Sequence, residues 1–286
     1  MKGRCYLLSL EEFWEGVDGE RYLREALHKV DVTRREKVER MRTEKSRAAC
    51  LGAGLLLQFA VQAAMREPEE EEHSVSAWTT GKMHTQGDRL IRERMLPQDD
   101  ISSREKVPFQ GKLLSRRQEG TEYGLTVYRV SGLLEQLHEV LDLKMYYSEN
   151  GKPYLQDYSL YFNLSHSGNY AVCAVSPREV GVDIQEQKQV NLERLAKRFF
   201  SEEEQSFLKA CANEKEQCKL FYQLWTRKEA YGKLTGEGIA AVIDKNMLRI
   251  SGREPSVAGT EDDSPLFWQE WELDGYAITL CQYGIK

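Results

Sequence analysis

Paired cysteines are missing from this chain of 286 residues. Its six cysteines are scattered, no two are spaced as Cys-x-x-Cys, and most of them lie among apolar residues. Free thiols in such surroundings behave as small hydrophobic side chains. The spacing therefore argues against a disulfide framework and against a zinc site.

An excess of positive charge is missing as well. The chain has 40 Lys and Arg residues against 46 Asp and Glu residues, which gives a formal net charge of −6. Broad nucleic-acid binding favours a basic surface, so the sequence predicts no nucleic-acid partner. A hydrophobic content of 41% with 30% charged residues is ordinary for a globular protein with a sizeable core.

Long hydrophobic segments are scarce. The N-terminal stretch MKGRCYLLSLEEFWEG reaches acidic residues too early for the apolar region of a signal peptide. The apolar run LGAGLLLQFAVQAAM (51–65) is too short to span a bilayer and contains two glutamines. We therefore expect a cytoplasmic protein without a membrane association.

The apolar pattern predicts an α+β fold. Polar residues from 67 to about 123, opening with EPEEEE, interrupt the pattern and indicate a surface insertion. The expected strands lie at 5–10, 124–130, 170–175, 179–185, 247–250, 266–273 and 276–282, and the expected helices lie before 41, at 51–65, at 131–141 and across 191–235.

A weak internal repeat suggests two similar halves. GNYAVCAV (168–175) and GYAITLCQ (275–282) both place a glycine before an apolar strand that an aromatic residue opens, and each strand follows a buried helix. The predicted division is an N-terminal half at 1–177, with the insertion, and a C-terminal half at 178–286.

Two stretches carry carboxylates in apolar surroundings. In GVDIQ (181–185), Asp183 emerges from a buried strand beside Gln185, which is costly unless the carboxylate is paired, hydrogen-bonded or bound to a metal. In WTRKEAYGKLTGEG (225–238), Glu229 and Lys233 are four residues apart and share one helix face. The ordinary alternatives are a strand-end carboxylate that caps a loop and a solvated salt bridge.

A polar cluster precedes another core strand in FNLSHSG (162–168). A nucleophilic pair of serine and histidine is disfavoured, because adjacent strand residues point to opposite faces. Ser165 and His166 fit phosphate binding better, since hydroxyl and backbone N–H groups are natural partners of anions. Asp183 and Glu229 suit Mg²⁺, which prefers one or two carboxylates together with substrate phosphates. Lys228, Lys233 and His166 could neutralise a pyrophosphate.

The stretch VDVTRREKVERMRTEKSRAAC (30–50) is basic in an otherwise acidic chain. It contains seven Lys and Arg residues against four acidic ones. This pattern indicates either a solvated helix face or a binding surface for phosphate or an acidic partner.

Taken together, these motifs resemble a known family. GKPYL (151–155), FNLSHSG, GVDIQ, RFFSEEE (198–204) and WTRKEAYGKLTGEG, in this order, resemble the Sfp-type 4′-phosphopantetheinyl transferases, and the form of the last motif resembles their W/KEA branch. TRREKVER (33–40) and SRAACLGAGLLL (46–57) resemble the N-terminal half of such enzymes. The resemblance leaves out the insertion and is loose in the C-terminal tail.

The resemblance implies a fold and an activity. Members of this family are monomers of two α+β halves related by a pseudo-twofold axis, with coenzyme A bound between the halves. They transfer the phosphopantetheine arm of coenzyme A to a serine of an apo acyl, peptidyl or aryl carrier protein and release 3′,5′-ADP. Mg²⁺, with Mn²⁺ as a substitute, is the cofactor that the resemblance implies.

The resemblance also implies roles for individual residues. Asp183, Gln185 and Glu229 would hold the metal, and Glu229, Lys233 and His166 would be catalytic. Coenzyme A would be bound by Arg34, Lys37, Arg47, Gly151, Lys152, Pro153, Ser165, His166, Lys228 and Lys233. Gln185 stands where many relatives have glutamate, so we expect weaker metal binding without loss of activity.

Two other functions are compatible with parts of the pattern. A non-catalytic binder of coenzyme A or of a carrier protein would not need Asp183, Glu229 and Lys233, and only Gln185 favours it. A metal-dependent hydrolase of nucleotide pyrophosphates would usually have more clustered carboxylates for two metals.

Overall fold

The computed structural model describes residues 3–15, 17–66, 124–248 and 266–284. The polar insertion predicted at 67–123 lies outside the described residues. The described part contains helices and sheets in one chain, which confirms the predicted α+β class.

The first sheet is built from N-terminal and central segments. Its strand order is β2-β1-β6-β5, in which β1 and β2 are parallel and the other pairs are antiparallel. The strands are β1 (Arg4–Ser9), β2 (Leu125–Arg129), β5 (Tyr161–Ser167) and β6 (Tyr170–Ser176). A separate hairpin consists of β3 (Met145–Tyr147) and β4 (Pro153–Leu155).

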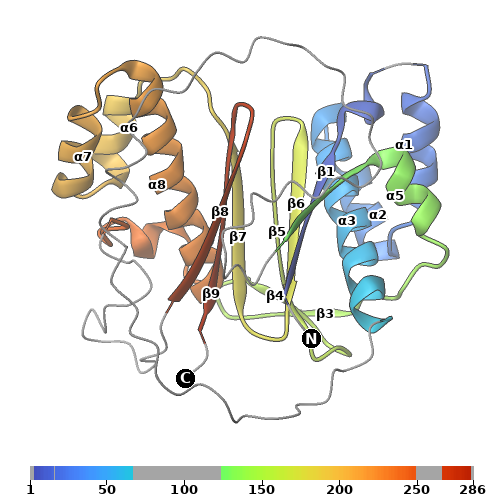
Figure 1. Ribbon diagram of the computed structural model, residues 1–286. Coiled ribbons are helices and arrows are strands. Elements are labelled where there is room, and N and C mark those ends of the chain that lie inside the picture. The colour runs from blue at the N-terminus through green and yellow to red at the C-terminus, as the bar shows by residue number, and fades with distance from the viewer. Residues whose placement is uncertain (1–2, 16, 67–123, 249–265, 285–286) are drawn as a thin grey trace, which may run out of the picture.

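Helices cover one face of this sheet (Figure 1). They are α1 (Gly19–His28), α2 (Val32–Glu39), α3 (Glu44–Met65) and α5 (Val130–Gln136), and a short 3₁₀ helix, η1, spans Glu11–Phe13. The predicted helix at 51–65 begins earlier, at Glu44, because the Thr43 hydroxyl caps it by accepting the backbone N–H of Ser46. The helix predicted at 131–141 ends at Gln136.

Helix α3 is long and apolar enough to cross a membrane by length and composition alone. However, 83% of its most apolar window is buried inside the protein. It packs against β1, β5 and β6. Its apolar surface on all sides is therefore explained by burial in the core of this half.

The second sheet comes from the C-terminal part of the chain. Its order is β7-β9-β8 with antiparallel pairing, and its strands are β7 (Val180–Glu186), β8 (Leu266–Leu273) and β9 (Tyr276–Tyr283). Helices α6 (Leu192–Phe199), α7 (Glu202–Lys209) and α8 (Glu214–Thr235) lie on its outer side, followed by the 3₁₀ helix η2 (Ile239–Val242).

The strand predicted at 247–250 is wrong for the residues that are described. Met247 and Leu248 form a turn, and the rest of that range lies outside the described residues. The backbone N–H of Met247 donates to the buried carboxylate of Glu204, and its carbonyl accepts from Arg227. These side chains take the place of a strand partner, and the Met247 side chain fills the core.

The two sheets share a core and meet where β5 lies beside β7. One apolar cluster contains residues of both sheets, including Leu7, Val172, Val182 and Ile278. Each sheet carries a helix of 22 residues on its outer side, α3 on one and α8 on the other (Figure 1). The twofold relation of the halves and their boundary at 177/178 stay predictions.

Candidate active site

Side chains of β5 bridge the two sheets. Asn163, Ser165 and Ser167 alternate along the strand, so they point to the same face. Asn163 accepts the backbone N–H of Val182 at 3.0 Å, and Ser167 accepts that of Glu186 at 3.0 Å. This explains why a core strand carries so dense a polar cluster, because its polar side chains bond to β7.

The middle member of this row holds Asp183. The Ser165 hydroxyl donates to Asp183 Oδ1 at 2.7 Å, and the Gln185 amide donates to Asp183 Oδ2 at 3.1 Å. Asp183 is only 1% exposed. A carboxylate at this depth requires such partners, because an unpaired buried charge is very costly. Ser165, predicted to contact phosphate, is a partner of the carboxylate in this structure.

A glycine allows α8 to lie directly on β7. A Cβ atom at Gly181 would be 2.0 Å from the carbonyl oxygen of Ala230 and 2.6 Å from the backbone nitrogen of Leu234. Only glycine permits so close an approach of two backbones. The Thr226 and Thr279 hydroxyls, 2.7 Å apart, fix the helix at a second point.

This packing brings Lys233 to the buried carboxylate. Its ammonium donates to Asp183 Oδ1 at 2.6 Å and to the Val182 carbonyl at 3.2 Å. The Lys233 side chain is 26% exposed, so this ion pair joins a buried acid to a partly solvated base. Lys233 therefore pairs with a carboxylate of β7. The alternative considered from the sequence was a solvated salt bridge with Glu229 within the helix.

Glu229 lies one helical turn before Lys233 on the same face of α8. Its pKa is raised by burial and by the negative charge of Asp183, and Lys233 partly opposes this shift. A carboxyl group whose pKa is raised toward neutrality is a better proton acceptor than an ordinary glutamate and is a common feature of active sites.

The positive charges of several predicted coenzyme-binding residues act on His166. Its pKa is lowered by desolvation and by the positive charges of Lys233, Lys37 and Arg34, while Asp183 opposes the shift. Lys37 and Arg34 come from α2, in the other half of the chain. The cluster therefore combines positive charges from both halves around one exposed imidazole.

Two carboxylates at this site are donors of the kind that Mg²⁺ prefers. Asp183 and Glu229 supply two carboxylates, and the effect of Asp183 on the pKa of Glu229 indicates negative charge that a cation would relieve. Among the described residues, no group of three or more His, Cys, Asp and Glu side chains could hold a metal. Gln185 turns its amide nitrogen toward Asp183, and its predicted role as a metal ligand stays a prediction.

The expectation for Lys228 requires correction. Its side chain is fully buried, and its ammonium contacts Glu204 at 3.2 Å and the carbonyls of Ile243 and Lys245. Five residues of helix separate it from Lys233, which corresponds to about 140° around the axis. Lys228 therefore holds the segment after α8 and does not face the carboxylate cluster.

The other residues predicted to bind coenzyme A lie in the turn before β4 and near the start of α3. Gly151 is exposed in the turn before β4, where its φ of 84° favours glycine, and Pro153 opens β4. Lys152, by contrast, is buried and contacts Glu179 and the Leu234 carbonyl. Arg47 donates to the Met41 carbonyl at 3.0 Å at the surface.

Aromatic residues of two motifs have a structural role that the motif pattern did not predict. Trp225 packs edge-on against Phe199 at 4.9 Å, and Phe200 lies 5.0 Å from Phe221. The helices that carry these motifs are thereby fixed around α8. The spacing of large aromatic residues could have indicated this core.

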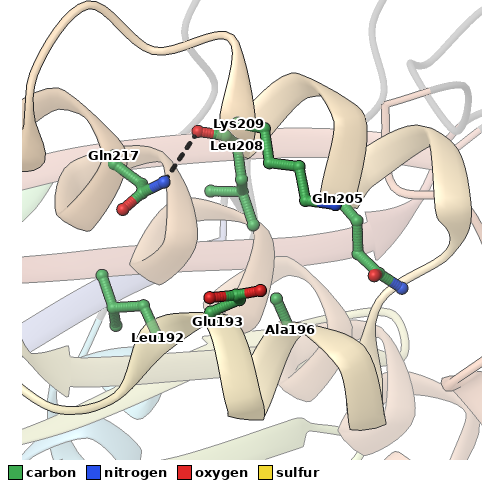
Figure 2. A pocket seen from close by; sticks show the side chains of 7 residues that line it. All are labelled: Leu192, Glu193, Ala196, Gln205, Leu208, Lys209 and Gln217. Carbon is green, nitrogen blue, oxygen red and sulfur yellow. Dashed lines mark hydrogen bonds between the residues drawn. The ribbon is translucent and has the colours of Figure 1, made fainter.

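A pocket lies away from the carboxylate cluster. Figure 2 shows it between α6, α7 and the start of α8, where its rim carries a hydrogen bond from Gln217 to the Leu208 carbonyl. None of the predicted site residues lines it. This pocket therefore lends no support to the predicted site, which rests on the side-chain contacts of β5, β7 and α8.

The comparisons with known proteins agree with the motifs at this cluster. Residues 179–281 match the model of the 4′-phosphopantetheinyl transferase superfamily, a range that contains Asp183, Glu229 and Lys233. This part of the chain is therefore similar to that superfamily. It is 36% identical over 143 residues to the 4′-phosphopantetheinyl transferase Sfp of Bacillus subtilis, and 42% identical over 120 residues to the 4′-phosphopantetheinyl transferase HetI of a Nostoc species.

A vertebrate relative is also similar. The chain is 30% identical over 135 residues to the L-aminoadipate-semialdehyde dehydrogenase-phosphopantetheinyl transferase of Xenopus laevis. The three matches cover 49%, 40% and 43% of this chain, and 63%, 50% and 45% of the respective relatives. The chain thus matches half to two thirds of the length of the superfamily members Sfp and HetI, and somewhat less of the vertebrate protein.

Proposed function

We propose that this protein is a 4′-phosphopantetheinyl transferase, which moves the phosphopantetheine arm of coenzyme A to a serine of an apo acyl or peptidyl carrier protein. The observation that carries the proposal is the cluster of Asp183, Glu229 and Lys233 within the range that matches the superfamily. Three relatives with this activity in their names support it.

Coenzyme A would lie along the cations whose charges act on His166. Arg34 and Lys37 come from α2, whereas Lys233 comes from α8, so a polyanion there would contact both halves. Phosphate groups are well matched to Arg and Lys side chains, which donate charge-assisted hydrogen bonds. The low pKa of His166 favours a neutral imidazole in the absence of phosphate, and a bound phosphate would favour its protonated form.

Asp183 and Glu229, with Gln185 beside them, would hold Mg²⁺. When bound, the ion would neutralise charge on the pyrophosphate of coenzyme A. Asp183 is oriented for this by Ser165 and Lys233. The site offers one negative charge fewer than a site with glutamate at position 185, so we expect a modest affinity for the ion.

The reaction forms one phosphorus–oxygen bond and breaks another. The serine hydroxyl of the carrier attacks the phosphorus atom next to the pantetheine arm, and the bond to the bridging oxygen breaks to release 3′,5′-ADP. Glu229 accepts the proton of the serine hydroxyl, directly or through water, and its raised pKa suits this task. Lys233 stabilises the negative charge that develops on the departing pyrophosphate oxygen.

The partner, oligomeric state and location belong to the same proposal. The partner is an apo carrier protein, and the protein acts as a cytoplasmic monomer without nucleic acid or membrane. The basic stretch 34–47 would help to dock an acidic carrier. A fall in transfer rate with added salt would support this docking, and a flat response would contradict it.

The test is intact-mass spectrometry of an apo carrier protein incubated with this protein, coenzyme A and Mg²⁺. We expect the carrier to gain one phosphopantetheine mass, and we expect EDTA to abolish the gain. Glu229→Gln should lose the activity. Glu237→Gln is the matched control, because this exposed glutamate follows α8 and lies outside the site.

Two results would contradict the proposal. The first is no mass gain on several unrelated carriers while coenzyme A still binds, which would favour the non-catalytic binder. The second is the appearance of 3′,5′-ADP without modified carrier, which would favour a pyrophosphate hydrolase.

A further inference from the structure

Lys152 occupies a position that its motif does not predict. It lies in the turn between β3 and β4. The resemblance implied that this motif lines the pocket for the adenine and 3′-phosphate of coenzyme A, and that Arg34 reaches the same end. The Lys152 side chain is nevertheless only 7% exposed. A buried ammonium requires partners, and Lys152 has two of them, the Leu234 carbonyl and the Glu179 carboxylate.

The first partner is the C-terminal end of α8. The Lys152 ammonium donates to the Leu234 carbonyl at 2.6 Å. The last four carbonyls of a helix lack intrahelical partners, and a cation there also interacts favourably with the helix dipole. The aliphatic part of Lys152 lies against Gly236, which ends α8 with a φ of 76°.

The second partner is Glu179, immediately before β7. Its carboxylate forms a salt bridge with the Lys152 ammonium. Burial and the same carboxylate also raise the pKa of Tyr154, two residues after Lys152. Glu179 is thus paired with Lys152 of the β3–β4 hairpin.

These contacts connect the hairpin to both elements that carry the candidate site. β7 begins next to Glu179 and carries Asp183. The last turn of α8 contacts the Lys152 ammonium, and the same helix carries Glu229 and Lys233. We propose that Lys152 is a positioning residue, which fixes the last turn of α8 and the start of β7 and thereby sets the distance between Asp183 and Lys233. This inference rests on the proposed transferase activity.

The test compares coenzyme A with 3′-dephospho-coenzyme A as substrates. Lys152→Met keeps the aliphatic part and removes the charge. We expect kcat to fall about tenfold to a hundredfold with both substrates, because small displacements of reacting groups are costly. The ratio of kcat/KM for the two substrates should stay within about twofold of the wild-type ratio, since a residue that does not touch the 3′-phosphate cannot select for it.

Two variants provide the comparison. Lys144→Met makes the same change at an exposed lysine just before the hairpin and should leave both reactions unchanged. Arg34→Met, at a predicted phosphate contact, should change the substrate ratio instead. If Lys152→Met does not fold, Glu179→Gln weakens the same salt bridge and should produce a smaller fall in kcat at an unchanged ratio.

A second measurement does not depend on activity. Amide hydrogen exchange of residues 230–236 should become faster in Lys152→Met and stay unchanged in Lys144→Met, because the last turn of α8 opens more readily without its partner. If the wild-type protein transferred nothing, this measurement would still test the positioning role, so the two failures are distinguishable.

Two outcomes would overturn the inference. One is a large fall in the ratio of kcat/KM for coenzyme A to that for 3′-dephospho-coenzyme A, while kcat and hydrogen exchange stay at wild-type values. That result would make Lys152 a ligand of the 3′-phosphate. The other is a variant with unchanged kinetics and unchanged exchange, which would leave Lys152 without a role in positioning.

Discussion

Helix α8 carries two lysine–carboxylate pairs that both have a buried carboxylate but differ in the exposure of the lysine. Lys228 and Glu204 lie 3.2 Å apart, and both side chains are 0% exposed. Lys233 and Asp183 lie 2.6 Å apart, with the lysine 26% exposed and the aspartate buried. The first pair is enclosed on all sides, whereas the second opens to the surface at its lysine.

The difference shows how a helix divides structural and chemical roles between its faces. The Lys228 ammonium also contacts backbone carbonyls that follow α8, and Glu204 caps α7 through Ser201 and binds the N–H of Met247. These groups satisfy one another. Asp183, Glu229 and Lys233 instead combine two carboxylates with one partly solvated cation, which leaves the site suited to a further cation and to phosphate.

Removal of Lys228 should break the structural pair with a large effect on stability. We expect Lys228→Met to lower the free energy of unfolding by about 3–5 kcal/mol, because it leaves the Glu204 carboxylate buried and unpaired. Urea unfolding measures the change.

The double variant Lys228→Met with Glu204→Gln sharpens this prediction. The glutamine carries no charge, and its single carbonyl oxygen can still accept one of the two backbone N–H groups that Glu204 accepts, so part of the lost stability should return. A double variant that is less stable than the two single losses added together would contradict the account.

The close approach of α8 to β7 can be broken at Gly181. We expect Gly181→Ala to cost about 1–3 kcal/mol in the free energy of unfolding, since its Cβ would clash with the Ala230 carbonyl. Gly132→Ala is the matched control in α5, where a Cβ meets nothing within 4 Å. This control should be neutral or slightly stabilising, and equal losses in both variants would refute the explanation.

The pKa of Glu229 makes a prediction about pH and stability. Because its pKa is raised in the folded protein, ionisation of this carboxyl costs stability as pH rises from the ordinary range of glutamate through the folded value. Glu229→Gln should therefore unfold at a higher temperature than wild type at about pH 8, and the gap should shrink toward about pH 4. A gap that is independent of pH would contradict the shift.

The smallest expected effect concerns Gln185. Gln185→Glu adds a third carboxylate beside Asp183, so Mg²⁺ should bind severalfold more tightly in isothermal titration. Without the ion, the variant should be less stable than wild type because like charges are crowded. Gln187→Glu, just beyond β7, is the control and should leave the affinity unchanged.

The sequence predicts which side chains share the face of α8 that carries Glu229 and Lys233, but it does not predict the burial of Lys228 on another face. Strand alternation and helical spacing are local properties, so the sequence placed Asp183 beside Gln185, and Glu229 on one face with Lys233. That these residues form one site was predicted from the chemistry of metal and phosphate binding and from the family resemblance. Lys228 was placed with them although it follows a different face. Its burial depends on Glu204 and on carbonyls after α8, which no local pattern reveals.

Long-range contacts explain the other differences. The burial of Lys152 results from the meeting of a hairpin with the end of a helix 82 residues further along the chain. The strand predicted at 247–250 was suggested by its apolar residues, whereas side chains of α7 and α8 bond to the backbone of Met247. By contrast, strands such as β8 and β9 were predicted within a residue or so, because their apolar patterns suffice.

The most direct test of the central claim compares the two faces of α8 in one assay. Single-turnover transfer of phosphopantetheine to an apo carrier would be measured by intact mass for Glu229→Gln and Lys228→Met, normalised to the folded fraction of each. The account predicts that Glu229→Gln loses about a hundredfold to ten-thousandfold in rate, and that Lys228→Met transfers at close to the wild-type rate. Wild-type transfer by Glu229→Gln, or inactive but folded Lys228→Met, would contradict it.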